Sequence, residues 1–240
     1  MKPANLDAAI IDLDGTMVDT LGDFVVAINL TLSDLGYAPV ASPVVAVRVG
    51  KGAEHLVASV LSHAKYLEKT AFTAITNEAT SSAHDELALA LTLYQRHYRH
   101  VNGKHSSVYP GVVDGLAGLQ HAGLALACLT NKPLSFAVAL LKLKGLDMFF
   151  SHIFGGDSFE RKKPDPLPVL RTCVALNVVP ARTLMVGDSS NDAQAARAAG
   201  CPVILVTYGY NHGEPVSCAG ADATIDSLAG LSPELRQIAR

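Results

Sequence analysis

The stretch Ile10-Ile11-Asp12-Leu13-Asp14-Gly15-Thr16-Met17-Val18-Asp19-Thr20 decides the fold of this 240-residue chain. The apolar run over residues 8–11 predicts a short strand that is buried on both faces and ends at a polar turn. Asp12 and Asp14 lie where this strand ends. Because residues two apart on a strand face the same side, both carboxylates are expected to point at one place. Two carboxylates that close repel each other unless a cation or a shared proton lies between them.

The turn that follows has its own chemistry. Gly15 permits a sharp change of direction, and the Thr16 hydroxyl with nearby N–H groups can then hold an anion. The pattern Asp-x-Asp-Gly-Thr therefore predicts a nucleophilic carboxylate, a second carboxylate for proton transfer and a site for a hard cation. The alternative is a solvated acidic turn after a strand, with no chemical role.

Three more stretches follow predicted strands or precede a helix. Thr130-Asn131 closes the strand 124–130, where a hydroxyl and an amide can bind an oxyanion; the alternative is an ordinary loop. Lys163 lies in the basic run 161–163 before a proline that can start a helix, and the alternative is a solvated surface. Asp188 and Asp192 follow the strand 183–187, and for Asp192 the alternative is a helix cap alone.

The order of predicted elements indicates an α/β fold. Strands at 8–11, 124–130, 152–154, 183–187, 203–206 and 223–225 alternate with helices at 112–121, 136–144, 166–176 and 192–199, which predicts a doubly wound, mostly parallel sheet with a Rossmann-like core. The first two strands are separated by more than 100 residues, whereas a βαβ unit needs about 30. Helices predicted at 21–35, 53–67 and 81–101 fill this gap, with Ser81 or Ser82 as a cap. We therefore expect a catalytic core of residues 1–16 and 105–240 and an inserted α-helical cap domain of residues 17–104.

Composition excludes several classes of partner. Hydrophobic residues make up 49% of the chain and charged residues 17%, which suffices for a sizeable core. The net charge of −3 without a basic block argues against nucleic acid and membrane surfaces as partners. The four cysteines are scattered, with no metal-binding spacing, and no signal segment or membrane-spanning run is present. We therefore expect a cytoplasmic protein, and the sequence leaves open whether it is a monomer or a homodimer.

Together the four motifs resemble those of the haloacid dehalogenase-like hydrolase superfamily: Asp12-Leu-Asp14-Gly-Thr16, Thr130-Asn131, Lys163-Pro164 and Gly187-Asp188-Ser-Ser-Asn-Asp192. The resemblance covers essentially the whole chain, and the insert is similar to the α-helical cap of the first type. The family's phosphatases carry the second aspartate of the first motif, and its dehalogenases lack it, so the resemblance implies a phosphatase. The stretches 129–133, 195–201 and Thr207-Tyr-Gly-Tyr-Asn-His-Gly213 resemble the phosphoglycolate phosphatase branch.

The resemblance and the residues together imply a mechanism. Asp12 would form a phosphoaspartyl intermediate, Asp14 would act as general acid and base, and Lys163 would orient Asp12. Bound Mg²⁺ is the implied cofactor, and its implied ligands are Asp12, Asp188 and the backbone carbonyl of Asp14, while Asp192 would either orient these ligands or bind the ion directly. The phosphate would be held by Thr16, Thr130 and Asn131.

The substrate is expected to be a small anionic phosphate ester, and the branch implies 2-phosphoglycolate. Another small ester, a nucleotide or pyrophosphate remains an alternative, and so does a catalytically silent phosphate-binding module. A small anionic substrate needs a cation near its carboxylate. The predicted cap loop with Arg48, Gly50, Lys51 and Gly52 offers Lys51 for this role while closing over the site. The alternative is a plain solvated turn.

Overall fold

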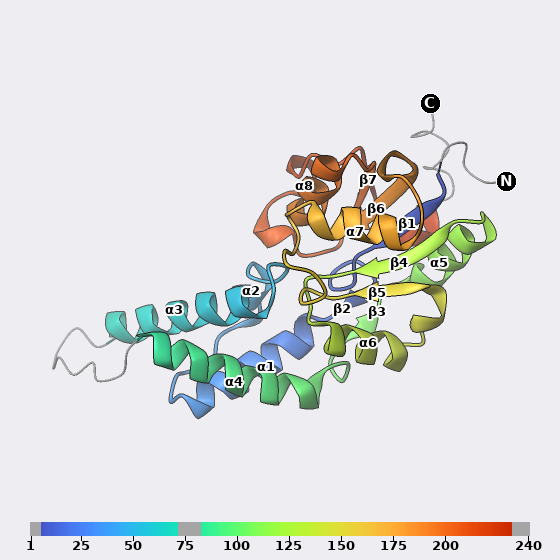
Figure 1. The fold of residues 1–240 in the computed structure, drawn as a ribbon. Coiled ribbons are helices and arrows are strands. Elements are labelled where there is room, and N and C mark those ends of the chain that lie inside the picture. Colours follow the sequence, from blue (N-terminus) through green and yellow to red (C-terminus); the bar gives the residue numbers. More distant parts are fainter. Residues whose placement is uncertain (1–5, 72–82, 232–240) are drawn as a thin grey trace.

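The computed structural model describes residues 6–71 and 83–231, and it confirms the α/β fold. All strands of the main sheet run parallel, in the order β5-β4-β1-β6-β7-β8 (Figure 1). The strands are β1 Ala8–Ile11, β4 Ala125–Leu129, β5 His152–Phe154, β6 Thr183–Gly187, β7 Val203–Val206 and β8 Ala223–Ile225. Strands β4 and β5 lie on one side of β1, and the chain then crosses to the other side to form β6, β7 and β8. This reversal makes the sheet doubly wound.

Strand β1 lies in the middle of this sheet, where Ile11 pairs with Cys128 on one neighbour and Val186 on the other. Ile11 packs into the core under helices α5 (Val112–His121) and α6 (Leu134–Leu143). Ile10 faces the opposite core, under α7 (Leu167–Ala175) and α8 (Ser190–Ala199). Figure 1 shows these helix pairs on opposite faces of the sheet. Burial on both faces explains the continuous apolar run that the sequence shows here.

The inserted helices form a separate bundle beside the sheet (Figure 1). They are α1 Leu21–Asp34, α2 Ser42–Ala46, α3 Ala53–Ala71 and α4 Ala83–Val101. Phe24 and Ile28 of α1 pack with Tyr94 and Tyr98 of α4 in a core of their own. These residues share one face of their helices, because side chains three and four residues apart lie on the same side, and they fall within the helices predicted at 21–35 and 81–101.

The helical insert departs from the prediction at its boundaries. Residues 42–46 form the one-turn helix α2, with Pro43 in its first turn, although no helix was predicted there. Helix α3 continues to Ala71 instead of ending at 67. The predicted caps Ser81 and Ser82 lie outside the described residues.

Two linkers join the helical insert to the sheet, and they run side by side. Strands β2 (Val18–Asp19) and β3 (Ser107–Val108) pair antiparallel, which the sequence did not predict. The buried carboxylate of Asp23 accepts hydrogen bonds of 2.7 Å from the backbone N–H groups of Gly103 and His105. This pairing fixes where the chain enters and leaves the insert. The division into domains at residues 17 and 105 stays a prediction.

The remaining described elements are short. Five 3₁₀ turns cover Asp147–Phe149, Pro180–Arg182, Asn211–Gly213, Val216–Cys218 and Leu228–Gly230. None of the helices in residues 6–71 and 83–231 is both long and apolar enough to cross a membrane.

Candidate active site

The carboxyl ends of three adjacent strands bring the predicted motifs to one edge of the sheet. Asp12 follows β1, Thr130 follows β4 and Asp188 follows β6. All three strands are parallel neighbours, so their ends meet in one place, which is where ligands bind in sheets of this kind. The helical insert lies over the same edge (Figure 1).

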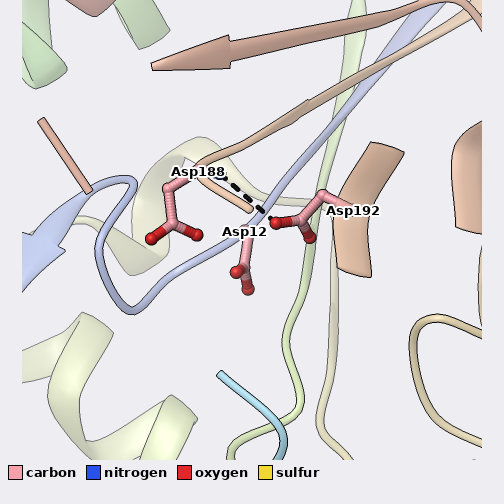
Figure 2. A group of neighbouring side chains, drawn as sticks. All are labelled: Asp12, Asp188 and Asp192. Carbon is pink, nitrogen blue, oxygen red and sulfur yellow. Dashed lines mark hydrogen bonds between the residues drawn. The ribbon is translucent and has the colours of Figure 1, made fainter. Parts of the chain in front are cut away.

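Three carboxylates gather here, as Figure 2 shows for Asp12, Asp188 and Asp192. One oxygen of each lies within 4.8 Å of the others, and all three residues are buried. Burial raises the pKa of Asp12 to about 7; Lys163 opposes this rise, while Asp192 and Asp14 add to it. Burial and the charges of Asp192 and Asp12 likewise raise the pKa of Asp188 well above its usual range. A bound cation would offset much of the free energy needed to ionise these buried carboxylates.

Lys163 lies among these acids, and it is buried while Arg161 and Lys162 are exposed. Its Nζ lies 3.0 Å from Asp12 Oδ1 and donates a 2.7 Å hydrogen bond to Asp192 Oδ1. Although burial lowers the pKa of Lys163, the two carboxylates raise it above its ordinary value, so the lysine remains protonated. Of the predicted basic run, only Lys163 therefore enters the acidic cluster.

Asp192 serves both as helix cap and as part of the cluster. Its Oδ1 accepts the hydrogen bond from Lys163, while its Oδ2 accepts 2.9 Å and 3.2 Å hydrogen bonds from the Ser189 hydroxyl and N–H. The Asp188 N–H donates to the same oxygen at 3.3 Å, the interaction dashed in Figure 2. These contacts cap α8 and fix the orientation of Asp192.

The free oxygens of the cluster fit a hard cation. Asp12 Oδ1 is buried and accepts no hydrogen bond from any described residue, although Lys163 lies beside it. Asp188 Oδ2 accepts a 2.7 Å hydrogen bond from the Tyr210 N–H. Most buried polar side-chain atoms have at least one hydrogen-bond partner, which the buried Asp12 oxygen lacks among the described residues. Asp12 and Asp188 are therefore better placed to bind a metal directly than Asp192, whose two oxygens both accept hydrogen bonds.

Asp14 is separated from the acidic cluster and pairs with a lysine that the sequence analysis gave no role. Lys132 Nζ donates a 2.8 Å hydrogen bond to Asp14 Oδ1 and a 2.6 Å hydrogen bond to the Tyr98 hydroxyl. The Lys132 side chain is only 2% exposed. Its position directly after Thr130-Asn131 was the one signal available in the sequence.

Asp12 and Asp14 line one cavity, of about 40 Å³, between the sheet edge and the helical insert. Among the described residues that line it, Lys132 is the one cation. The sheet side contributes Asp12, Asp14, Thr130, Asn131 and Lys132, and the insert contributes mostly apolar and aromatic groups, among them Phe24, Val49, Leu56, Tyr94 and Tyr98.

Two predicted binding residues lie outside this cavity. Thr16 is fully buried, and its hydroxyl has no hydrogen-bond partner among the described residues. Lys51 is exposed and lines a neighbouring open cavity together with Lys163 and Asn191. The loop predicted to bring Lys51 to the substrate carboxylate thus directs the carbonyl of Gly50 toward Asn131, while Lys51 itself lies outside the cavity that Asp14 lines.

Asn131 is also engaged differently from the prediction. Its side-chain amide donates to the carbonyl oxygens of Gly50, at 2.9 Å, and Lys163, at 2.8 Å, and its Oδ1 accepts from the Lys163 N–H at 3.0 Å. Asn191 donates a second, 3.2 Å hydrogen bond to the Gly50 carbonyl. The amide thus joins the insert to the sheet edge. Thr130 lines the cavity as expected, and its hydroxyl accepts a hydrogen bond from the Lys132 N–H.

The stretch 207–213 makes hydrogen bonds to residues of the first and fourth motifs, a role that its sequence did not reveal. Besides binding Asp188, Tyr210 donates its hydroxyl hydrogen to Asp19 Oδ1, at 2.7 Å. Tyr208 donates to the carbonyl of Thr16, at 2.8 Å. The same loop crowds Gly15, whose φ of +81° and contact with Asp188 leave no space for a side chain.

Comparison with known proteins decides the family. A model described as haloacid dehalogenase-like hydrolase matches residues 9–206. The chain belongs to this family. The hydrolase is 41% identical to a phosphoglycolate phosphatase of Thiobacillus denitrificans, over 95% of this chain and 94% of that protein. It is 44% identical to a plasmid-encoded phosphoglycolate phosphatase of Cupriavidus necator, over 93% of this chain and 90% of that protein.

A solved structure agrees with these relatives. The crystal structure of a predicted phosphoglycolate phosphatase from Haemophilus somnus superposes with a TM-score of 0.88 at 31% identity, covering 96% of this chain and 98% of that one. The resemblance inferred from the four motifs is thereby confirmed, and the hydrolase is an enzyme of that family.

Proposed function

We propose that this hydrolase cleaves 2-phosphoglycolate to glycolate and phosphate, using Mg²⁺ and a phosphoaspartyl intermediate on Asp12. One observation carries this proposal: Asp12 and Asp14 line the same cavity, and Asp12 also lies against Asp188 and Lys163. The named relatives, which match this chain over more than nine-tenths of its length, support the choice of substrate.

The chemistry follows from the two aspartates of the first motif. The Asp12 carboxylate attacks phosphorus, forming an acyl phosphate while the bond from phosphorus to the ester oxygen breaks. Asp14 donates a proton to that oxygen as it leaves. Asp14 then removes a proton from a water molecule, which attacks phosphorus and releases phosphate and the free Asp12 carboxylate. Lys163 orients Asp12 through their 3.0 Å ion pair.

The residues that would hold Mg²⁺ are Asp12, Asp188 and the backbone carbonyl of Asp14, with Asp192 as a further ligand or as the group that fixes its neighbours. The buried Asp12 oxygen without a hydrogen bond supports this assignment. When bound, the ion supplies positive charge against the negative charge of the carboxylate and the phosphate.

The phosphate is held by Thr130, which lines the cavity. Asn131 contributes by closing the cavity through Gly50. Thr16 is buried outside the cavity, so it supports phosphate binding only by shaping the turn after Asp14.

All of these residues come from one chain, so a monomer or a homodimer would each carry complete sites. The four cysteines are free, which fits a cytoplasmic location.

Phosphate release from a panel of small esters tests the proposal. The panel contains 2-phosphoglycolate, glycerol phosphates, nucleoside monophosphates and pyrophosphate, each assayed with Mg²⁺ and with a chelator. We expect the kcat/KM for 2-phosphoglycolate to exceed every other value and to require Mg²⁺. Similar kcat/KM values for all esters, each still requiring Mg²⁺, would reject 2-phosphoglycolate as the substrate and leave the phosphatase mechanism standing. No release from any ester would favour the silent phosphate-binding module.

A further inference from the structure

We infer that Lys132 is the residue that recognises the carboxylate of the substrate, an inference that rests on the proposed function. A small substrate that buries a phosphate and a carboxylate in a cavity needs a cation for each group. Lys163 is already engaged by Asp12, Asp192 and the Leu129 carbonyl. Lys51 lines a different, open cavity.

Lys132 has the hydrogen-bonding capacity for this role. An ammonium group carries three donors and no acceptor. Two donors of Lys132 are used, on Asp14 at 2.8 Å and on the Tyr98 hydroxyl at 2.6 Å. The third donor remains for an oxygen of the substrate, in the cavity that Lys132 itself lines.

The surroundings strengthen this contact. The Nζ of Lys132 lies 4.7 Å from the centre of the Phe24 ring and 4.8 Å from that of the Tyr98 ring. These rings hold the ammonium group in place and exclude water, so an ion pair made here is worth more than one at the surface. Burial and nearby Asp14 raise the pKa of the Tyr98 hydroxyl well above its usual range. Tyr98 therefore stays neutral and can donate its own hydrogen to the same carboxylate.

The spacing of the two groups matches the substrate. In 2-phosphoglycolate the carboxylate is attached to the carbon that carries the ester oxygen, so the two lie next to each other. In the structure Asp14, which serves the ester oxygen, touches Lys132 directly. An ester oxygen beside Asp14 thus places the carboxylate beside Lys132, and it places the methylene group among the aromatic rings.

Three substrates separate carboxylate recognition from an effect on Asp14. 2-Phosphoglycolate and 2-hydroxyethyl phosphate both release an alkoxide that needs a proton, but only the first has a carboxylate. p-Nitrophenyl phosphate releases a good leaving group and reports whether Asp12 and the metal site still work. The measured quantity is the ratio of kcat/KM for 2-phosphoglycolate to that for 2-hydroxyethyl phosphate, with saturating Mg²⁺.

For Lys132→Met we expect this ratio to fall by about 10- to 100-fold, the loss typical of one charge-assisted hydrogen bond, mainly through KM. Lys142→Met is the matched control, because Lys142 is an exposed lysine on the next helix. Its ratio should equal that of the wild type. Retained hydrolysis of p-nitrophenyl phosphate shows that Lys132→Met is folded.

Tyr98→Phe is the second variant. If Lys132→Met does not fold, the kcat/KM ratio of Tyr98→Phe alone tests the inference. This substitution removes the hydroxyl and should lower the ratio by several-fold. An unchanged ratio in a folded Lys132→Met protein, or in Tyr98→Phe when that variant stands alone, would overturn the inference and leave the proposed function intact. A wild-type enzyme that does not prefer 2-phosphoglycolate over 2-hydroxyethyl phosphate would overturn the proposed substrate, and the inference with it.

Discussion

The side-chain amide of Asn131 donates a 2.9 Å hydrogen bond to the carbonyl oxygen of Gly50, and this contact closes the helical insert over the sheet. Asn131 follows β4, whereas Gly50 lies between α2 and α3, 81 residues away in the sequence. The same amide also holds the backbone of Lys163. One side chain thus links the backbone of Lys163 to the loop of the insert that lines the cavity.

Asn131→Ala should lower kcat/KM for 2-phosphoglycolate by about 10- to 100-fold, because the buried backbone N–H and carbonyl of Lys163 lose their partner and the Gly50 carbonyl loses its shorter hydrogen bond. The free energy of unfolding should fall by about 1–3 kcal/mol for the same reason. Enzyme kinetics and urea unfolding measure the two effects. Asn191→Ala is the comparison, since it removes only the longer 3.2 Å bond to Gly50 and its contact with His212. Equal effects of the two substitutions would contradict the role given to Asn131.

Lys163→Met should abolish turnover and lower the free energy of unfolding by about 3–5 kcal/mol, because it leaves buried carboxylates without their cation. The side chain of Lys163 is 2% exposed, whereas its neighbour Lys162 is exposed. Lys162→Met is thus the matched control and should change stability by less than about 0.5 kcal/mol. Denaturant unfolding with Mg²⁺ absent checks both values. Similar stabilities of the two variants would show that Lys163 does not hold the acidic cluster together.

The stability of the metal-free protein should fall as the pH rises from about 4 to about 7. Burial raises the pKa of Asp12 from 3.8 to about 7 in the folded state. Protonated Asp12 therefore stabilises the fold at low pH, and this contribution is lost as the pH rises through about 7. Asp12→Asn stays neutral at every pH, so its unfolding free energy, measured in a chelator, should fall less steeply.

Mg²⁺ should restore stability to the wild type near the upper end of this range, since it binds the ionised carboxylates of the native state. The thermal midpoint with and without Mg²⁺ measures this gain. An identical pH slope in wild type and Asp12→Asn would show that another group dominates the titration.

Gly15→Ala should weaken Mg²⁺ binding and turnover together. At a φ of +81° a Cβ would collide with the Asp188 carboxylate and crowd the Tyr210 ring. The turn after Asp14 must then shift, and Asp188 with it. Gly36→Ala is the control for backbone strain alone, because Gly36 has a φ of +84° and no atom near its would-be Cβ. If both variants require the same Mg²⁺ concentration for half-maximal activity, the collision with Asp188 does not weaken Mg²⁺ binding and the prediction is wrong.

The sequence was most informative where strands are buried on both faces. Residues 8–11 and 203–206 are continuous apolar runs between polar turns, and their predicted and observed bounds agree. The same pattern places Asp12 and Asp188 correctly at one edge, since the ends of parallel neighbours must meet. The two-residue strands β2 and β3 escaped prediction because so short a pairing leaves no periodic signal.

Contacts between the insert and the sheet could not be derived in the same way. Lys51 and Lys132 are both single lysines in loops, and nothing local tells which one enters the cavity. The outcome depends on how the loop carrying Gly50 packs against Asn131, and on Tyr98 of a distant helix reaching Lys132. Packing between segments that are distant in the sequence determines which lysine enters the cavity. Helical and strand periodicity carry no information about such packing.

The most direct test of the account is to find the phosphoryl group on Asp12. The wild-type enzyme is mixed with Mg²⁺ and excess 2-phosphoglycolate, quenched in acid within one turnover, digested and examined by mass spectrometry. We predict a phosphorylated peptide containing residues 10–20, with the modification on Asp12, and no such peptide from Asp12→Asn, which should also have lost turnover. Rapid Mg²⁺-dependent hydrolysis by Asp12→Asn, or a phosphoryl group on another residue, would contradict Asp12 as the nucleophile.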